Sequence, residues 1–224
     1  MVSWELDAVK IRAYDWGMAT NNYHHGDLKN ALIEAGLEIL SKEDVGGLTL
    51  RKVARQAGVS HSAPYAHFAD KQALIAAIAT EGYRLLYEKM LEIQQKFSDD
   101  PSRQLVEVAW AYVYLAQNDP AQFKVTFSSA VAREKDYPAL VEMTGNCFNQ
   151  VVRIVKACQQ AGILAPSEPD TMAVSIWSVV HGFASLLIEG QISHLVLERT
   201  SVEDLLLFVL NQVTLNDLKL MMRD

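Results

Sequence analysis

Residues 49–71 have the sequence TLRKVARQAGVSHSAPYAHFADK, and this stretch decides the fold. Its apolar residues recur first at the spacing of a helix: Leu50, Val53, Ala54 and Ala57. Thr49 stands at the N-cap position, where its hydroxyl can accept a hydrogen bond from the first turn. Gly58 can end that helix in a left-handed conformation. Ser60 is then expected to cap a second helix, and two short helices joined by a tight turn form a helix-turn-helix.

A net positive charge marks the same stretch. It contains the cations Arg51, Lys52, Arg55 and Lys71 against the single acid Asp70, whereas the whole chain has a formal net charge of −7. A positive island on an acidic protein indicates local contact with phosphate rather than a general attraction to polyanions. A solvated helix face is the alternative. The caps, the turn and the polar second helix favour the phosphate interpretation.

Two segments of the chain resemble a known family. HHGDLKNALIEAGLEIL at 24–40 and LTLRKVARQAGVSHSAPYAHFADKQAL at 48–74 look like the N-terminal DNA-binding domain of TetR-type transcriptional regulators. The positions that carry this resemblance are Gly58-Val59-Ser60, Tyr65, His67-Phe68, Lys71 and Leu74. The resemblance implies an all-helical, homodimeric, ligand-responsive repressor. Pro64 departs from the family pattern, and because proline lacks an N–H we expect the second helix to start late or to be tight.

The expected DNA contacts all lie in this region. Thr49, Tyr65 and Lys71 are expected to hold phosphates, and Arg51 belongs to the same surface. Four further residues lie where groove contacts or their supports belong: Ser60, His61, Ser62 and His67. For His67 an alternative is packing against Phe68 and the first helix.

The chain as a whole has the composition of a soluble globular protein. It has 224 residues, of which 50% are hydrophobic and 21% charged, enough for one or two domains with a sizeable core. We expect an all-α fold with an N-terminal extension of unclear structure (1–22), a three-helix DNA-binding head (23–70) and a larger helical bundle for effector binding and dimerisation (71–224). The bundle's helices are predicted at 71–97, 102–117, 120–131, 138–161, 170–190 and 201–218. Asp70 is expected to cap the first of them, and Pro120 suits the first turn of the third.

The sequence contains no motif typical of an enzyme or of a metal or cofactor site. It has no Gly-rich phosphate loop, nucleophile elbow or Cys-x-x-Cys pair. The adjacent His24 and His25 supply only one ligand face. Cys147 and Cys158 lie about three helical turns apart, too far to form a disulfide. The first twenty residues do not resemble a secretory signal. We therefore expect a cytoplasmic protein that is not an enzyme and needs no cofactor.

The last two long helices are apolar almost all round. The longest apolar stretch, 172–188, falls short of the ~20 residues of a membrane span, so we expect a buried helix and no membrane contact. A helix that is apolar on every side must be buried on more than one side. Either the helix is fully internal or a second subunit covers it, and the family resemblance favours a homodimer. The interface residues expected are Val180, Ala184, Leu187, Leu206, Val209 and Val213.

Aromatic residues suggest where an effector binds. Trp177 and His181 share a helix face and precede Gly182, a pattern that resembles a subgroup of TetR-type effector domains. Either His181 is a satisfied core residue or it belongs to an aromatic pocket with a few polar groups. The pocket residues expected are Trp110, Tyr114, Phe123, Phe127, Phe148, Trp177 and His181.

Together these observations predict a homodimeric repressor that binds a palindromic double-stranded DNA operator and is released by a small, largely apolar ligand. A helical ligand-binding protein with a vestigial helix-turn-helix is a second hypothesis. An all-helical enzyme is a third, against which the absence of a catalytic set argues.

Overall fold

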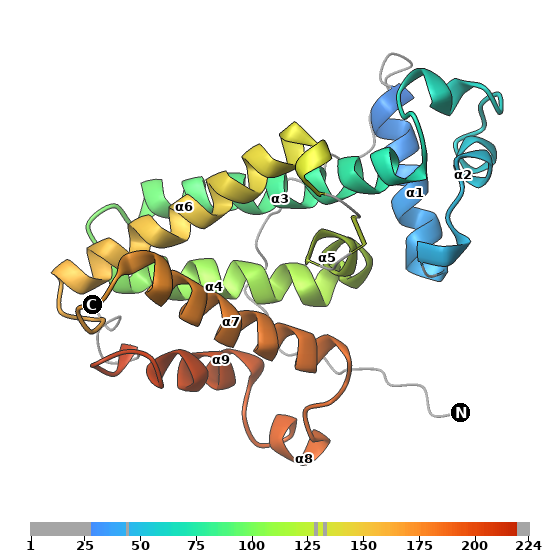
Figure 1. The fold of residues 1–224 in the computed structure, drawn as a ribbon. Helices are drawn as coiled ribbons and strands as arrows, with labels where there is room; N and C mark the ends of the chain where they lie inside the picture. Colours follow the sequence, from blue (N-terminus) through green and yellow to red (C-terminus); the bar gives the residue numbers. More distant parts are fainter. Residues whose placement is uncertain (1–27, 44, 128–129, 132–133, 219–224) are drawn as a thin grey trace.

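The computed structural model describes residues 28–43, 45–127, 130–131 and 134–218. The expectations for 1–22 and for the His24-His25 pair lie outside these residues. Within them every regular element is helical, which confirms the predicted fold class (Figure 1). The α-helices are α1 Leu28–Lys42, α2 Leu50–Gln56, α3 Lys71–Lys96, α4 Pro101–Asn118, α5 Pro120–Phe127, α6 Pro138–Gln160, α7 Pro169–Ile188, α8 His194–Leu197 and α9 Val202–Asn211. Three short 3₁₀ turns, η1 Val45–Gly47, η2 Ala63–Ala66 and η3 Glu134–Asp136, complete the chain.

The first three helices and η2 form a small head at one end of the molecule (Figure 1). Its core is a cluster of fully buried apolar side chains, among them Leu32 of α1, Val53 of α2 and Ile75 of α3. Helix α3 starts in this core and runs on into the bundle, where α4, α5 and α6 pack against it. One continuous helix therefore links the head to the rest of the chain.

Several local predictions for the head are confirmed. The Thr49 hydroxyl accepts a hydrogen bond from the Lys52 N–H at 3.2 Å, and the Asp70 carboxylate accepts one from the Ala73 N–H at 2.8 Å. Gly58 has a φ of 69°, a conformation that a residue without a Cβ adopts at little cost. These features depend only on neighbouring residues, which is why the sequence pattern predicted them.

The prediction that Ser60 caps the second helix is wrong. This helix is a 3₁₀ turn that begins only at Ala63, and Ser62 precedes it without a capping hydrogen bond. Pro64 sits in its first turn, where the missing N–H and the ring disfavour an earlier α-helical start. The Ser60 hydroxyl instead lies 3.1 Å from that of Ser62. The expectation of a late and tight helix is confirmed.

Helix α5 is held on α3 by a buried polar contact. The Gln122 side-chain amide donates to the Ile78 carbonyl and to the Thr126 hydroxyl, both at 2.8 Å. The two helices approach closely at Gly82, where a Cβ would lie only 2.0 Å from the Thr126 hydroxyl. A glycine in the middle of a 26-residue helix is therefore explained by the space that α5 occupies.

The last long helix is shorter than predicted. It was expected at 201–218 but spans only Val202–Asn211. Beyond it the chain is tied to the loop after α6, because the Leu215 N–H donates to the Ile163 carbonyl at 2.8 Å and the Asn216 amide donates to the Gly162 carbonyl at 3.1 Å. These long-range hydrogen bonds compete with further helical turns. They could not be predicted from a local sequence pattern.

Three of the residues expected in a subunit interface belong instead to the protein's own core. Val180, Ala184 and Leu206 are buried within this chain, against α4 and the other bundle helices. The apolar side chains left exposed on α7 and α9 are Val174, Trp177, Leu186 and Phe208. Leu187, Val209 and Val213 are half-buried. The interface assignment failed for these three residues because the sequence of a helix that is apolar on every side does not show which sides the rest of the chain covers.

Helix α7 is therefore not fully internal to this chain, which was one of the two alternatives for it. Among the described residues it is the one helix that is long and apolar enough, by length and composition, to span a membrane, a test that core helices also pass. Here α7 packs along α4, α6 and α9, with its remaining side open (Figure 1).

Candidate functional site

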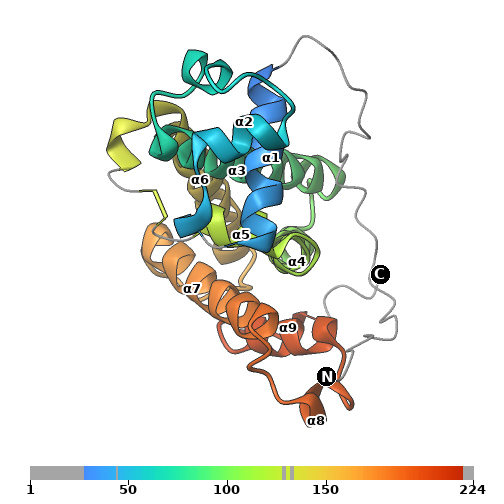
Figure 2. The ribbon, with the colours of Figure 1, turned by 90° about the vertical axis from the view of Figure 1, so that its right-hand side faces the viewer.

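The first candidate surface lies on the outside of the head. Helix α2, η2 and the start of α3 lie together at one end of the molecule, turned toward the viewer in Figure 2. The residues that link α2 to α3 bury little: Ser60, His61 and Ser62 are exposed, and the Tyr65 side chain is 61% exposed. Burial of Pro64 and Phe68 anchors the segment to the head core. The polar and aromatic side chains are therefore displayed on a fixed backbone.

The expected phosphate contacts border the same surface. Thr49 and Arg51 are exposed at the start of α2, and Lys71 is half-buried in the first turn of α3. No ion pair of Arg51 or Lys71 lies within the described residues. The Lys52 ammonium, in contrast, lies 2.7 Å from the Glu43 carboxylate, so its charge is partly neutralised.

The position of His67 bears on its two expected roles, a contact in the DNA groove or packing against Phe68 and the first helix. Its ring is exposed, and its centroid lies 6.4 Å from that of Phe68. It also lines a cavity of about 340 Å³ that Lys29 and Ile33 of α1 share with the start of α6. This position resembles the packing alternative against the first helix more than a free groove contact.

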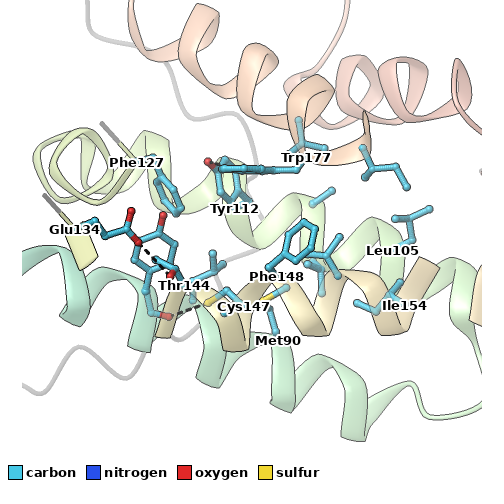
Figure 3. A pocket seen from close by; sticks show the side chains of 18 residues that line it. Met90, Leu105, Tyr112, Phe127, Glu134, Thr144, Cys147, Phe148, Ile154 and Trp177 are labelled. Carbon is cyan, nitrogen blue, oxygen red and sulfur yellow. Dashed lines mark hydrogen bonds between the residues drawn. The ribbon is translucent and has the colours of Figure 1, made fainter. Parts of the chain in front are cut away.

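The second candidate is a cavity of about 400 Å³ inside the helical bundle. Helices α3, α4, α6 and α7 form its walls, and Phe127 and η3 close one end (Figure 3). Most of its 18 lining residues are apolar, such as Met90, Leu105 and Ile154. The polar groups among the lining residues belong to Tyr83, Tyr112, Glu134, Thr144, Cys147 and Trp177. A chamber of this size and composition is typical of a small-molecule site.

Two polar side chains of one wall, Tyr112 and Trp177, form hydrogen bonds with each other and with His181 behind the wall. The Tyr112 hydroxyl lies 2.7 Å from Nδ1 of His181 and accepts a longer hydrogen bond, 3.4 Å, from Nε1 of Trp177. When the Tyr112 hydroxyl donates to Nδ1, all three groups are paired with His181 neutral. Partial burial lowers the pKa of His181 and so favours this neutral form.

The remaining polar groups of the cavity are also neutral, with one exception. Burial raises the pKa of the Tyr112 phenol and, together with the nearby Cys147 and Glu134, that of the Tyr83 phenol. Burial likewise raises the pKa of the Cys147 thiol to about 12, and this thiol donates to the Tyr83 carbonyl at 3.3 Å. The exception is the Glu134 carboxylate.

The structure brings only part of the predicted pocket set together. Phe127, Phe148 and Trp177 line the cavity. His181 and Phe123 do not: they stand behind the Tyr112 ring and line a second hollow of about 430 Å³. Trp110 is buried and Tyr114 half-buried, and neither lines these two spaces.

Fifteen of the 18 lining residues were not predicted, and five of these carry polar groups: Tyr83, Tyr112, Glu134, Thr144 and Cys147. Tyr83, Tyr112 and Cys147 lie on long helices, and the positions of their side chains follow from helix packing. Glu134 and Thr144 lie at the junction of η3 and α6, where a polar residue in the sequence is indistinguishable from ordinary surface.

The second hollow lies where the head meets the bundle. It is lined by Leu40, Glu43 and Val45 from the head, by α5, and by His181, Ser185 and the end of α7. Across it the Lys124 ammonium lies 2.7 Å from the Glu189 carboxylate. The Tyr112–His181 hydrogen bond thus connects the wall of the cavity to the surface on which the head rests.

Both cysteines lie on α6, as predicted, and each is buried and free. Within the described residues there is no group of three or more potential metal ligands.

Comparison with known proteins gives a consistent picture. Residues 32–78 match the model of bacterial regulatory proteins of the tetR family, and residues 105–209 match that of the tetracyclin repressor-like C-terminal domain. The class A tetracycline repressor from transposon 1721 of Escherichia coli is 46% identical over 50 residues, which is 22% of this chain and 23% of that repressor. The chain thus spans about a quarter of the length of that curated relative.

Solved structures resemble a larger part of the chain. A protein of unknown function from Rhodococcus sp. RHA1 is 28% identical, with a TM-score of 0.69 over 86% of this chain and 96% of the other. AibR, solved in complex with isovaleryl coenzyme A and operator DNA, is 15% identical, with a TM-score of 0.58 over 73% of this chain and 95% of the other. At that identity the likeness to AibR concerns the fold.

Proposed function

Because this chain belongs to the TetR family of bacterial transcriptional regulators, we propose that it is a homodimeric repressor that binds a palindromic DNA operator and is released by a small, largely apolar ligand. The observation that carries this proposal is the pairing of an exposed polar segment at 60–65 with an internal cavity, joined by one helix, α3. AibR supports it, because a protein of the same fold binds both operator DNA and an acyl coenzyme A.

DNA recognition is assigned to the outside of the head. Thr49, Arg51, Tyr65 and Lys71 hold phosphates, while His61 and its serine neighbours reach the groove. The exposure of these side chains on a backbone anchored by Phe68 supports this role. We propose that head and bundle divide at 70/71 in function only, because the first turns of α3 also complete the head core through Leu74 and Ile75. As a DNA-binding regulator the protein works in the cytoplasm.

Release of the protein from operator DNA requires the ligand to bind preferentially to a state in which the head is displaced. A ligand with equal affinity for both states would shift nothing. The route is supported by contacts: the cavity wall includes Tyr112 and Phe127, Tyr112 is hydrogen-bonded to His181, and α5 packs on both α1 and α3. A ligand that moves Tyr112 or Phe127 therefore alters the surface beneath α1.

The test is selection of bound fragments from the source genome with the full-length protein, followed by titration of the recovered operator. Specific retention of a palindromic sequence is expected. A ligand-binding protein with a vestigial helix-turn-helix would retain no sequence specifically, and an enzyme would turn over its ligand. For any ligand found, the factor by which it weakens operator binding must equal the factor by which operator weakens ligand binding, about 5- to 150-fold for typical allosteric coupling.

A further inference from the structure

The charge of the cavity is the first clue to what it binds. Among its 18 lining residues Glu134 carries the only formal charge. Within the described residues no cation lies at ion-pair distance from this carboxylate. The Glu134 side chain is exposed at the edge of a largely apolar space, where its negative charge attracts a cation and repels a carboxylate or phosphate.

The groups beside Glu134 present oxygen lone pairs. The single hydroxyl hydrogen of Thr144 is shared between two acceptors, the Val141 carbonyl at 3.0 Å and the Glu134 carboxylate at 3.3 Å. Toward a ligand Thr144 is therefore an acceptor. The neutral Tyr83 phenol also offers oxygen lone pairs, in addition to its own O–H. This end of the cavity is suited to a ligand that donates hydrogen bonds.

Aromatic rings surround the same end. The ring centroids of Tyr83 and Phe127 lie 5.1 Å apart with an interplanar angle of 72°, and those of Tyr112 and Phe127 lie 4.7 Å apart. Phe148 and Trp177 continue the aromatic wall. The faces of such rings attract a cation through their quadrupole.

The cavity is polar at one end and apolar at the other. Figure 3 shows Glu134 and Thr144 at one end, with Leu105 and Ile154 at the opposite end. Its volume of about 400 Å³ accommodates a compact organic molecule but not a large one.

We propose that this cavity binds an amphipathic organic cation, an inference that rests on the effector site proposed above. The ammonium group lies beside Glu134 and Thr144 among the aromatic rings, and an aromatic or aliphatic body extends toward Leu105 and Ile154. Anionic effectors, including an acyl coenzyme A of the kind that AibR binds, are disfavoured, because their charge would face Glu134 and none of the described lining residues carries a positive charge.

The test is isothermal titration calorimetry of the full-length protein with three molecules that share one body: phenylbutylamine, phenylbutanol and phenylbutanoate. The amine is expected to bind about tenfold more tightly than the alcohol, and the carboxylate more weakly than either. Glu134→Gln should lower the affinity for the amine to nearly that for the alcohol, and should leave the affinity for the alcohol unchanged. Glu142→Gln removes the same charge from an exposed position on α6 outside the cavity, and should keep the preference for the amine.

A further variant separates the two levels of the proposal. Val151→Phe narrows the cavity and should weaken binding of the amine and the alcohol in parallel. The assignment of a cation is overturned if the wild type binds the alcohol and the amine with equal affinity, or if Glu134→Gln keeps the preference for the amine. In either case the cavity remains a ligand site. If none of the three molecules binds, or if Val151→Phe affects none, the cavity itself is not the site.

Discussion

At the scale of single residues, Lys71 and His61 offer different chemistry to DNA. Lys71 is a flexible cation in the first turn of α3, and His61 is an exposed ring with hydrogen-bonding nitrogens just before η2. Lys71→Ala should weaken binding to all sequences and reduce the slope of log K against log salt by about one, because one phosphate contact is lost. His61→Ala should instead relax sequence preference. Fluorescence anisotropy with operator and random duplexes at several salt concentrations measures both effects.

The matched control is Lys156→Ala, which removes the same charge from an exposed position on α6. Its salt slope should equal that of the wild type. Wild-type behaviour of both head variants on both duplexes would show that DNA is bound elsewhere.

His181 links protonation to stability. Its pKa in the folded chain is lowered by burial, so below the ordinary value of about 6.5 the unfolded state binds more protons than the folded one. Stability should therefore be unaffected above this pH and should fall as the pH drops toward the folded-state pKa. Protonation of Nδ1 also removes the acceptor of the Tyr112 hydroxyl.

Thermal unfolding between pH 7.5 and 5 measures this effect. His181→Gln should lose less stability than the wild type over this range, while His194→Gln, a change at an exposed histidine on α8, should follow the wild type. Equal acid sensitivity of His181→Gln and the wild type would assign the loss to other groups.

At the scale of elements, the contact between α5 and α3 depends on Gly82. A Cβ there would meet the Thr126 hydroxyl at 2.0 Å and the Gln122 amide nitrogen at 2.5 Å. Gly82→Ala should therefore destabilise the protein by about 1–3 kcal/mol, in spite of the better helix propensity of alanine. Chemical denaturation measures the change.

Gly145→Ala on α6 is the control, because an added Cβ meets nothing within 4 Å there, and it should be neutral or mildly stabilising. Thr126→Ala should partly rescue Gly82→Ala, since it removes the nearest atom. Additive effects of the two changes in a double-mutant cycle would contradict this account.

At the scale of the whole molecule, the open sides of α7 and α9 are where we expect a second subunit. Phe208 is 64% exposed and Leu186 is 47% exposed, on two helices that pack together. Phe208→Glu or Leu186→Glu should dissociate a dimer while leaving a folded chain, because each charge replaces an apolar side chain that points away from the core. Leu206→Asp should unfold the chain, because it buries an unpaired charge.

Sedimentation velocity at micromolar concentration distinguishes these outcomes, with Val141→Glu on α6 as a control that should remain dimeric. In the dimer the two heads should match half-sites about 34–36 Å apart, or a multiple of this, on one face of the duplex. A wild-type chain that sediments as a folded monomer would refute the dimer.

The sequence by itself determined the features whose causes are local. The Thr49 and Asp70 caps, the left-handed turn at Gly58 and the helix starts at Pro120 and Pro138 each depend on one residue and its immediate neighbours. Apolar periodicity likewise predicted every long helix, because a 3.6-residue repeat is visible without knowledge of the partner. Pro64 correctly predicted that η2 would be tight, but the sequence did not show that Ser60 would not cap it.

Only the tertiary structure decided which side of each helix is covered. Periodicity gives positions around an axis, but on α7 and α9 apolar residues occupy nearly every position, so the pattern does not distinguish Ala184 in the core from Leu186 outside. The same holds for the cavity: Tyr112 separates His181 from it, and Glu134 reaches it from a 3₁₀ turn that is unremarkable in sequence. The end of α9 depends on bonds to Gly162 and Ile163. These properties arise from contacts between residues far apart in the chain, which only the packed structure brings together.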